Sequence, residues 1–139
     1  MLPELPAYEL FIYTLQQRFP SIHHSTLVIV RHGVTFAELA GIITFADDIT
    51  LEIWEDLNFA TRVIQGYSYA VNQGGQRLYW YDPQPHPNEP SLASTHPHHK
   101  HMPPEIKHHR VPAPGLSFDQ PNLPQLLSLI HISEPTRPY

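Results

Sequence analysis

The chain of 139 residues contains no cysteine, and this absence excludes disulfide bonds and thiolate metal sites. Any bound metal ion would have to be held by histidine and carboxylate side chains. No apolar run has the length of a membrane span, and the N-terminus lacks the basic and hydrophobic pattern of a secretory signal. We therefore expect a cytoplasmic protein with no membrane partner.

The chain also lacks an excess of positive charge. Its formal net charge is −5 with neutral histidines, so overall charge does not favour nucleic-acid binding. The distribution is uneven, however, because residues 96–110 contain Lys100, Lys107, Arg110 and six histidines against one acid, Glu105. This segment predicts a local basic edge whose charge depends on pH.

Histidine and proline are abundant in the same part of the chain. Eight of the 11 histidines lie between His86 and His131, and prolines flank or interrupt them from Pro83 to Pro114. Proline removes a backbone donor and fixes φ, so residues 83–115 are predicted to form an irregular loop. Imidazoles on a stiff loop suit proton transfer or metal binding, because histidine titrates near neutral pH.

The remaining patterns predict a single α+β domain over residues 1–130. Apolar residues at three- and four-residue spacing predict an N-terminal helix over 5–19. Short or alternating apolar segments predict strands over 25–30, 38–45, 49–57, 62–71 and 77–81. Because the connections are short, we expect an antiparallel meander of four to five strands with the first helix on one face.

A second helix is predicted near the end of the chain, over residues 122–130. Pro124 suits its first turn, and an apolar face recurs from Leu123 to Ile130. Residues 131–139 resemble a translated sequencing-adaptor tail. We therefore expect a non-native end and a C-terminal helix that is cut short.

Several segments together carry a family resemblance. Tyr-Trp-Tyr-Asp ends at Asp82, Pro-His-Pro surrounds His86, and His-His-Lys-His occupies residues 98–101. With Gly-Ile-Ile-Thr-Phe at 41–45 and Leu-Glu-Ile at 51–53, this arrangement resembles the TumE family of toxin–antitoxin proteins over about residues 25–130. The resemblance implies a toxin whose partner is a helix-turn-helix antitoxin encoded nearby.

The first functional hypothesis is a ribonuclease that acts on RNA. Cleavage through the 2′-hydroxyl of RNA needs a base, an acid and a cation near the phosphate. His86 with His98 or His99 is the preferred acid–base pair, Lys100 would neutralise the phosphate, and Asp82 would orient one imidazole. The predicted catalytic set is Asp82, His86, His98, His99, Lys100 and His101.

Two further hypotheses use the same segment differently. In a metal site, His99 and His101 would lie on one side of an extended segment, and His86 and Asp82 would close the set around zinc or another divalent ion. Alternatively, the loop has no catalytic role and docks a partner such as the antitoxin. The sequence leaves all three hypotheses open.

Overall fold

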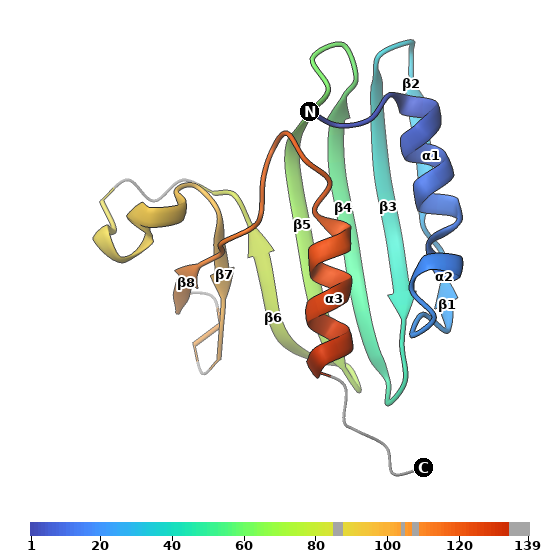
Figure 1. The fold of residues 1–139 in the computed structure, drawn as a ribbon. Helices are drawn as coiled ribbons and strands as arrows, with labels where there is room; N and C mark the ends of the chain where they lie inside the picture. Colours follow the sequence, from blue (N-terminus) through green and yellow to red (C-terminus); the bar gives the residue numbers. More distant parts are fainter. Residues whose placement is uncertain (85–87, 104, 107–108, 134–139) are drawn as a thin grey trace.

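The computed structural model describes residues 1–84, 88–103, 105–106 and 109–133, and its main feature is one antiparallel sheet (Figure 1). Among these residues the sheet has eight strands in the order β1-β3-β4-β5-β6-β7-β8, with β2 also paired to β3. The strands are β1 (His24–Ser25), β2 (Val28–His32), β3 (Phe36–Thr44), β4 (Ile49–Asn58), β5 (Val63–Gln73), β6 (Gln76–Asp82), β7 (His99–His101) and β8 (Arg110–Pro112). The helices are α1 (Leu5–Tyr13), α2 (Leu15–Arg18), the 3₁₀ helix η1 (Pro90–Thr95) and α3 (Leu123–Ser133).

The predicted meander forms the long central part of the sheet. β3 to β6 follow one another as antiparallel neighbours, as the alternating segments indicated. Asp47 and Asp48 connect β3 to β4, and both have positive φ, a conformation that aspartate tolerates in tight turns. The mixed helix-and-sheet class and the antiparallel pairing are therefore confirmed.

The predicted number of strands was too small, and the segment 83–115 explains much of the difference. Within the described part of that segment, β7 and β8 extend the sheet beyond β6, and η1 precedes them. The prolines flank these strands instead of interrupting them, and Pro112 ends β8 at the edge of the sheet. An edge position tolerates proline because its missing N–H is not needed by a further strand.

The segment predicted as one strand over 25–30 forms two short strands, β1 and β2, which both pair with β3. The break lies beside Gly41, whose φ is +149°. A Cβ atom at this glycine would lie 2.8 Å from Leu27 Cα and 2.8 Å from the Thr26 carbonyl oxygen. Glycine therefore allows the two backbones to approach closely at this point.

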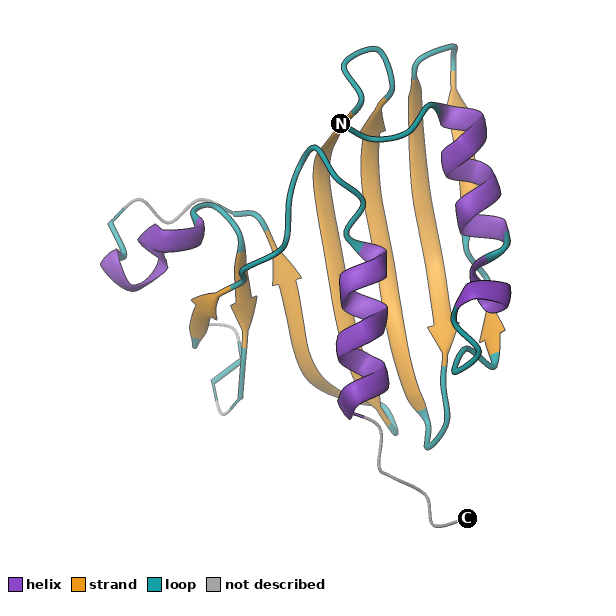
Figure 2. Ribbon diagram, viewed as in Figure 1, coloured by secondary structure: helices purple, strands orange, loops and turns teal. Residues whose placement is uncertain are grey.

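The helices α1, α2 and α3 lie on one face of the sheet, whereas η1 lies to the side of β6, near β7 (Figures 1 and 2). The predicted N-terminal helix is divided at Thr14 into α1 and α2, and α3 begins near the predicted position. Residues 131–133 belong to α3, whereas residues 134–139 of the predicted non-native tail lie outside the described part of the chain. No helix among the described residues is long and apolar enough to cross a membrane.

A buried carboxylate links these helices to the sheet. Glu55 on β4 is fully buried and accepts hydrogen bonds from the hydroxyls of Tyr8 on α1 and Tyr69 on β5. Asn122, the residue before α3, donates from Nδ2 to the Tyr69 hydroxyl at 3.0 Å. Burial raises the pKa of Glu55, although the two tyrosine hydrogen bonds act in the opposite direction. This network fixes both helices over the centre of the sheet.

Candidate metal centre

The end of β6 and the short strand β7 bring one carboxylate and two imidazoles together. Asp82 is the last residue of β6 and lies opposite His99, while Trp80 lies opposite His101. Side chains alternate along a strand, so His99 and His101 share one face of β7 and Lys100 points to the other. Both histidines are buried, and Asp82 is 23% exposed at the side chain.

The three side chains face one another through their acceptor atoms. His99 Nε2 lies 2.9 Å from Asp82 Oδ1, and His101 Nε2 lies 3.1 Å from Asp82 Oδ2. The two Nε2 atoms are 3.0 Å apart. Asp82, His99 and His101 each offer one ligand atom, and these atoms all lie within 4.8 Å of one another, so this group of described residues could hold a metal ion.

Backbone carbonyl groups determine which nitrogen of each ring carries the hydrogen. His99 Nδ1 lies 3.1 Å from the Pro97 carbonyl oxygen, and His101 Nδ1 lies 3.0 Å from that of Ile106. A carbonyl oxygen can only accept, so each Nδ1 must donate. In the neutral rings both Nε2 atoms then carry lone pairs directed at each other and at the carboxylate. This is the arrangement of metal-binding histidines whose second nitrogen is held by a carbonyl.

Asp82 is held in its charged form by donors on both oxygens. The Gln84 backbone N–H donates to Oδ1 at 3.0 Å, and the Trp80 indole N–H donates to Oδ2 at 3.1 Å. Partial burial raises the pKa of Asp82, but these hydrogen bonds, together with attraction to His99 and His101 when they are protonated, outweigh it and lower the pKa overall. The carboxylate is therefore both oriented and ionised at neutral pH.

The two histidines are held in the neutral form. Removal from solvent lowers the pKa of His99 and of His101, and the Arg110 guanidinium adds to the effect. The Asp82 charge acts in the opposite direction but does not compensate. Neutral imidazole binds metal ions, whereas imidazolium does not, because both of its nitrogens carry hydrogen.

The spacing of the ligand atoms fits a metal ion. With metal–ligand bonds of about 2.1 Å, neighbouring ligands at right angles lie about 3.0 Å apart, and tetrahedral ligands about 3.4 Å apart. The separations of 2.9, 3.0 and 3.1 Å involve both oxygens of Asp82 as well as the two Nε2 atoms, and they are close to the spacing of neighbouring ligands around one ion. Two histidines and one carboxylate leave other coordination positions open, as in the sites that hold iron(II) or catalytic zinc.

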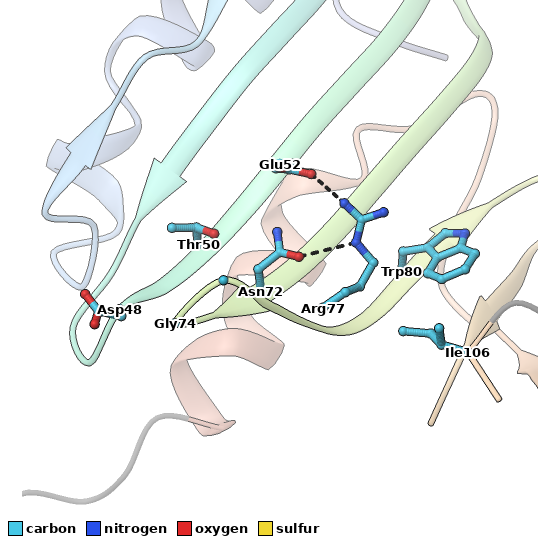
Figure 3. Close-up of a pocket in the computed structure, with 9 residues that line it drawn as sticks. Asp48, Thr50, Glu52, Asn72, Gly74, Arg77, Trp80 and Ile106 are labelled. Carbon is cyan, nitrogen blue, oxygen red and sulfur yellow. Dashed lines mark hydrogen bonds and ion pairs between the residues drawn. The ribbon is translucent and has the colours of Figure 1, made fainter. Parts of the chain in front are cut away.

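A cavity lies next to the centre. Its volume is about 800 Å³, and Trp80 and Ile106 form one end of its lining (Figure 3). The Trp80 ring stacks on the His101 ring with centroids 4.0 Å apart, so a single indole separates the cavity from a ligand of the centre. Arg77 also lines the cavity, where it donates to Glu52 at 2.8 Å and to Asn72 at 3.3 Å. The remaining lining residues are Asp48, Thr50, Gly74 and Gly75.

The other residues of the predicted catalytic set lie elsewhere. His98 stacks on Tyr67 and contacts Phe118, and its Nδ1 lies 2.6 Å from the Tyr67 hydroxyl. The ammonium of Lys100 lies 3.9 Å from the centre of the Tyr79 ring. His86, expected both as an acid–base residue and as a metal ligand, lies outside the described residues.

Two residues beside the centre were not assigned to it from the sequence. Trp80 was given no role in a site from the sequence, yet its indole contacts both His101 and Asp82. Arg110 was counted only in the basic edge of residues 96–110, yet this residue of β8 lies opposite His101 of β7. The alternation of residues 80 and 82 on one strand could have identified Trp80, but Arg110 depends on the pairing of β7 with β8.

Comparison with known proteins identifies the family. The family model described as Toxin TumE matches residues 12–133, which is most of the chain. This chain belongs to the TumE toxin family. The match includes the whole of the Asp82, His99 and His101 centre, and a toxin family implies an antitoxin partner. No curated protein and no solved structure matches the chain.

Proposed function

We propose that this member of the TumE family is the toxin of a toxin–antitoxin pair and acts through a divalent metal ion held by Asp82, His99 and His101. One observation carries the proposal: two Nε2 atoms and a carboxylate converge at 2.9–3.1 Å while both Nδ1 atoms donate to carbonyl groups. Acceptors this close repel one another unless a cation lies between them. A proton is disfavoured in that role because both ring pKa values are lowered.

The substrate class that we propose is RNA. A divalent ion at the centre would stabilise the negative charge that develops on a phosphodiester during cleavage. The ribose 2′-oxygen forms a bond to the adjacent phosphorus, and the bond from phosphorus to the 5′-oxygen breaks. The proton lost from the 2′-oxygen ends on the 5′-oxygen. The products carry a 2′,3′-cyclic phosphate and a 5′-hydroxyl, and no further reactant is consumed.

Neighbouring side chains support an anionic, base-containing substrate. Arg110 lies opposite His101 in the pairing of β7 with β8, and its charge contributes to the lowered pKa values of His99 and His101. Trp80 provides an aromatic surface at the end of the adjacent cavity, and bases of single-stranded RNA commonly stack on such rings. We therefore assign phosphate neutralisation to Arg110 in addition to the metal ion.

The metal-dependent mechanism differs from simple acid–base catalysis by histidine. A ring nitrogen that binds a metal ion cannot accept a proton at the same time, so His99 would be a ligand and not a base. Roles for His86, His98 and Lys100 stay predictions, as does the helix-turn-helix class of the antitoxin.

The His98 and Tyr67 side chains form a neutral pair beside the centre. Burial and the neighbouring histidines lower the pKa of His98, and burial raises the pKa of Tyr67. Both groups are then neutral, and the hydroxyl donates to Nδ1.

The metal site is tested by calorimetric titration of the untagged full-length chain, stripped by chelation, with Zn²⁺ and separately with Mn²⁺. We expect one tight site in the wild type that is lost in Asp82→Asn and in His101→Gln. His24→Gln, which removes an exposed histidine on β1, is the matched control and should bind like the wild type. Equal binding by wild type and His101→Gln would exclude this centre as the metal site.

The reaction is tested with an end-labelled single-stranded RNA and the same RNA carrying one 2′-deoxy position. We expect cleavage that stops with chelator, returns with the metal ion, and fails at the deoxy position because the attacking oxygen is absent. Cleavage that persists in chelator would refute the metal ion as catalyst. Tight metal binding without cleavage, combined with growth arrest on expression, would refute RNA cleavage while retaining the metal centre.

A further inference from the structure

The face of the sheet opposite the helices carries exposed apolar side chains. Both α1 and α3 lie on one face (Figures 1 and 2), and within the described residues no helix lies over the other face of β2, β3 and β4. Along β3 and β4, buried residues alternate with exposed or partly exposed ones. The exposed large apolar residues of these strands, with their exposed fractions, are Val28 (50%), Val30 (49%), Phe36 (44%), Ile42 (40%) and Trp54 (39%).

Strand register gathers these five residues, which we call the open-face patch, onto adjoining rows. Val28 lies opposite Ala40, and Ala40 lies opposite Trp54, so a row crosses three strands. Phe36 lies opposite both His32 and Asn58, and Ile42 lies opposite Glu52. Directly opposite residues share a face, so all five residues lie on the same face of the sheet, in neighbouring rows.

Two carboxylates lie in the same rows as residues of the open-face patch. In the row that contains Val30, Glu38 on β3 lies directly opposite Asp56 on β4. Like charges in opposite positions are unfavourable, and within the described residues neither carboxylate forms a salt bridge. A partner that brings positive charge to this row would remove the repulsion and cover the apolar residues around it.

We propose that the open-face patch is the docking surface for a cationic amphipathic segment of the antitoxin. This rests on the toxin function proposed above. The apolar residues supply area to bury, and Glu38 and Asp56 supply charge complementarity for Lys or Arg. RNA is a poor occupant because its phosphates would meet these carboxylates. A second copy of the chain is also disfavoured, since a two-fold contact would place the carboxylates against their own equivalents.

The open-face patch continues into the metal centre. One row runs from Ile42 through Glu52 and Ala70 to Trp80, and Trp80 lies opposite His101. From Ile42 to His101 the row crosses four strand spacings of about 4.8 Å each, which is about 19 Å. A helix of about 13 residues spans that distance at 1.5 Å per residue. A docked segment of this length would cover Trp80 and block the approach to the centre, which would neutralise the toxin.

The test uses the protein encoded by the reading frame adjacent to this gene as the probe. Its affinity is measured by calorimetry for the full-length chain carrying Asp82→Asn, so that the result does not depend on toxin activity. We expect Val30→Glu and Glu38→Lys each to weaken binding by at least about tenfold. Val30→Glu places a charge where the docked segment would bury apolar area, and Glu38→Lys reverses the charge that a cationic segment would meet. Trp54→Ala provides a second apolar variant should Val30→Glu fold poorly.

The matched control is Leu10→Glu, because Leu10 is a large exposed apolar residue on α1, on the helix side of the sheet. It should leave the affinity unchanged. Undiminished binding by well-folded Val30→Glu and Trp54→Ala variants would overturn the proposal. The proposal would also be overturned if the adjacent protein failed to bind the chain. The same holds if the chain bound a single-stranded RNA and Glu38→Lys abolished that binding, or if sedimentation analysis showed a dimer that Val30→Glu dissociates. None of these results depends on metal binding or RNA cleavage.

Discussion

Replacement of Trp80 by phenylalanine is the most specific test of how the metal centre is supported. The change keeps an aromatic ring next to His101 but removes the indole N–H that donates to Asp82 Oδ2 at 3.1 Å. A hydrogen bond to a charged group contributes about 1.5–3 kcal/mol. Loss of a residue that orients a metal ligand typically lowers metal affinity about 10–100-fold, or about 1.4–2.7 kcal/mol. The two magnitudes agree, so we expect Trp80→Phe to lower the metal affinity of the centre by about 10–100-fold.

The assay is a calorimetric titration of the untagged, metal-free chain with Zn²⁺, read as the dissociation constant and the number of ions bound. The matched control is Trp54→Phe, because Trp54 is also a partly exposed tryptophan on the same face and packs near Gly66, away from the centre. We expect Trp54→Phe to bind the ion like the wild type. The reasoning fails if Trp80→Phe retains full affinity, or if both variants lose affinity equally.

Three other substitutions test separate parts of the structure. Glu55→Gln removes a group that titrates. The pKa of Glu55 is raised in the folded protein, so the contribution of the Glu55 carboxyl to stability is complete below its unfolded pKa. That contribution declines as the pH rises through the folded pKa. The free energy of unfolding of the variant, relative to wild type, should therefore rise as the pH increases above the unfolded pKa of about 4 in chemical denaturation, and a constant difference would contradict this account. Gly41→Ala should lower the free energy of unfolding by about 1–3 kcal/mol or more, because the added Cβ meets neighbouring backbone at 2.8 Å; an unchanged melting temperature would contradict this. Lys100→Met should cost about 0.5–2 kcal/mol through the lost contact with the Tyr79 ring but leave Zn²⁺ affinity unchanged, and a loss of affinity would place Lys100 at the centre.

Much of the fold followed from local patterns. The alternation along residues 49–57 and the short connections predicted the antiparallel meander, because a strand that is half buried repeats every two residues. Leu123 to Ile130 predicted α3 from helical spacing alone. The strands β7 and β8 could not be predicted this way. Each has three residues: β7 bonds to the edge that β6 offers, and β8 bonds to the edge that β7 then offers.

The same division applies to the candidate centre. Histidine and aspartate were recognised from residue type, since an acidic chain without cysteine has few other means of holding a metal ion. The choice among the candidates needed the register of β6 with β7, which sets Asp82 opposite His99. A shift of one residue would have turned Lys100 toward the carboxylate and both histidines away.

Composition and periodicity by themselves determined the α+β class, the antiparallel meander and the type of ligand available, because these depend on residue chemistry and on short-range spacing. Tertiary structure alone decided which imidazoles meet Asp82, that Trp80 and Arg110 lie beside them, and that one face of the sheet is left open. These features depend on pairing between residues far apart in the chain. Such pairing is selected by the packing of the whole sheet and leaves no local signal in the sequence.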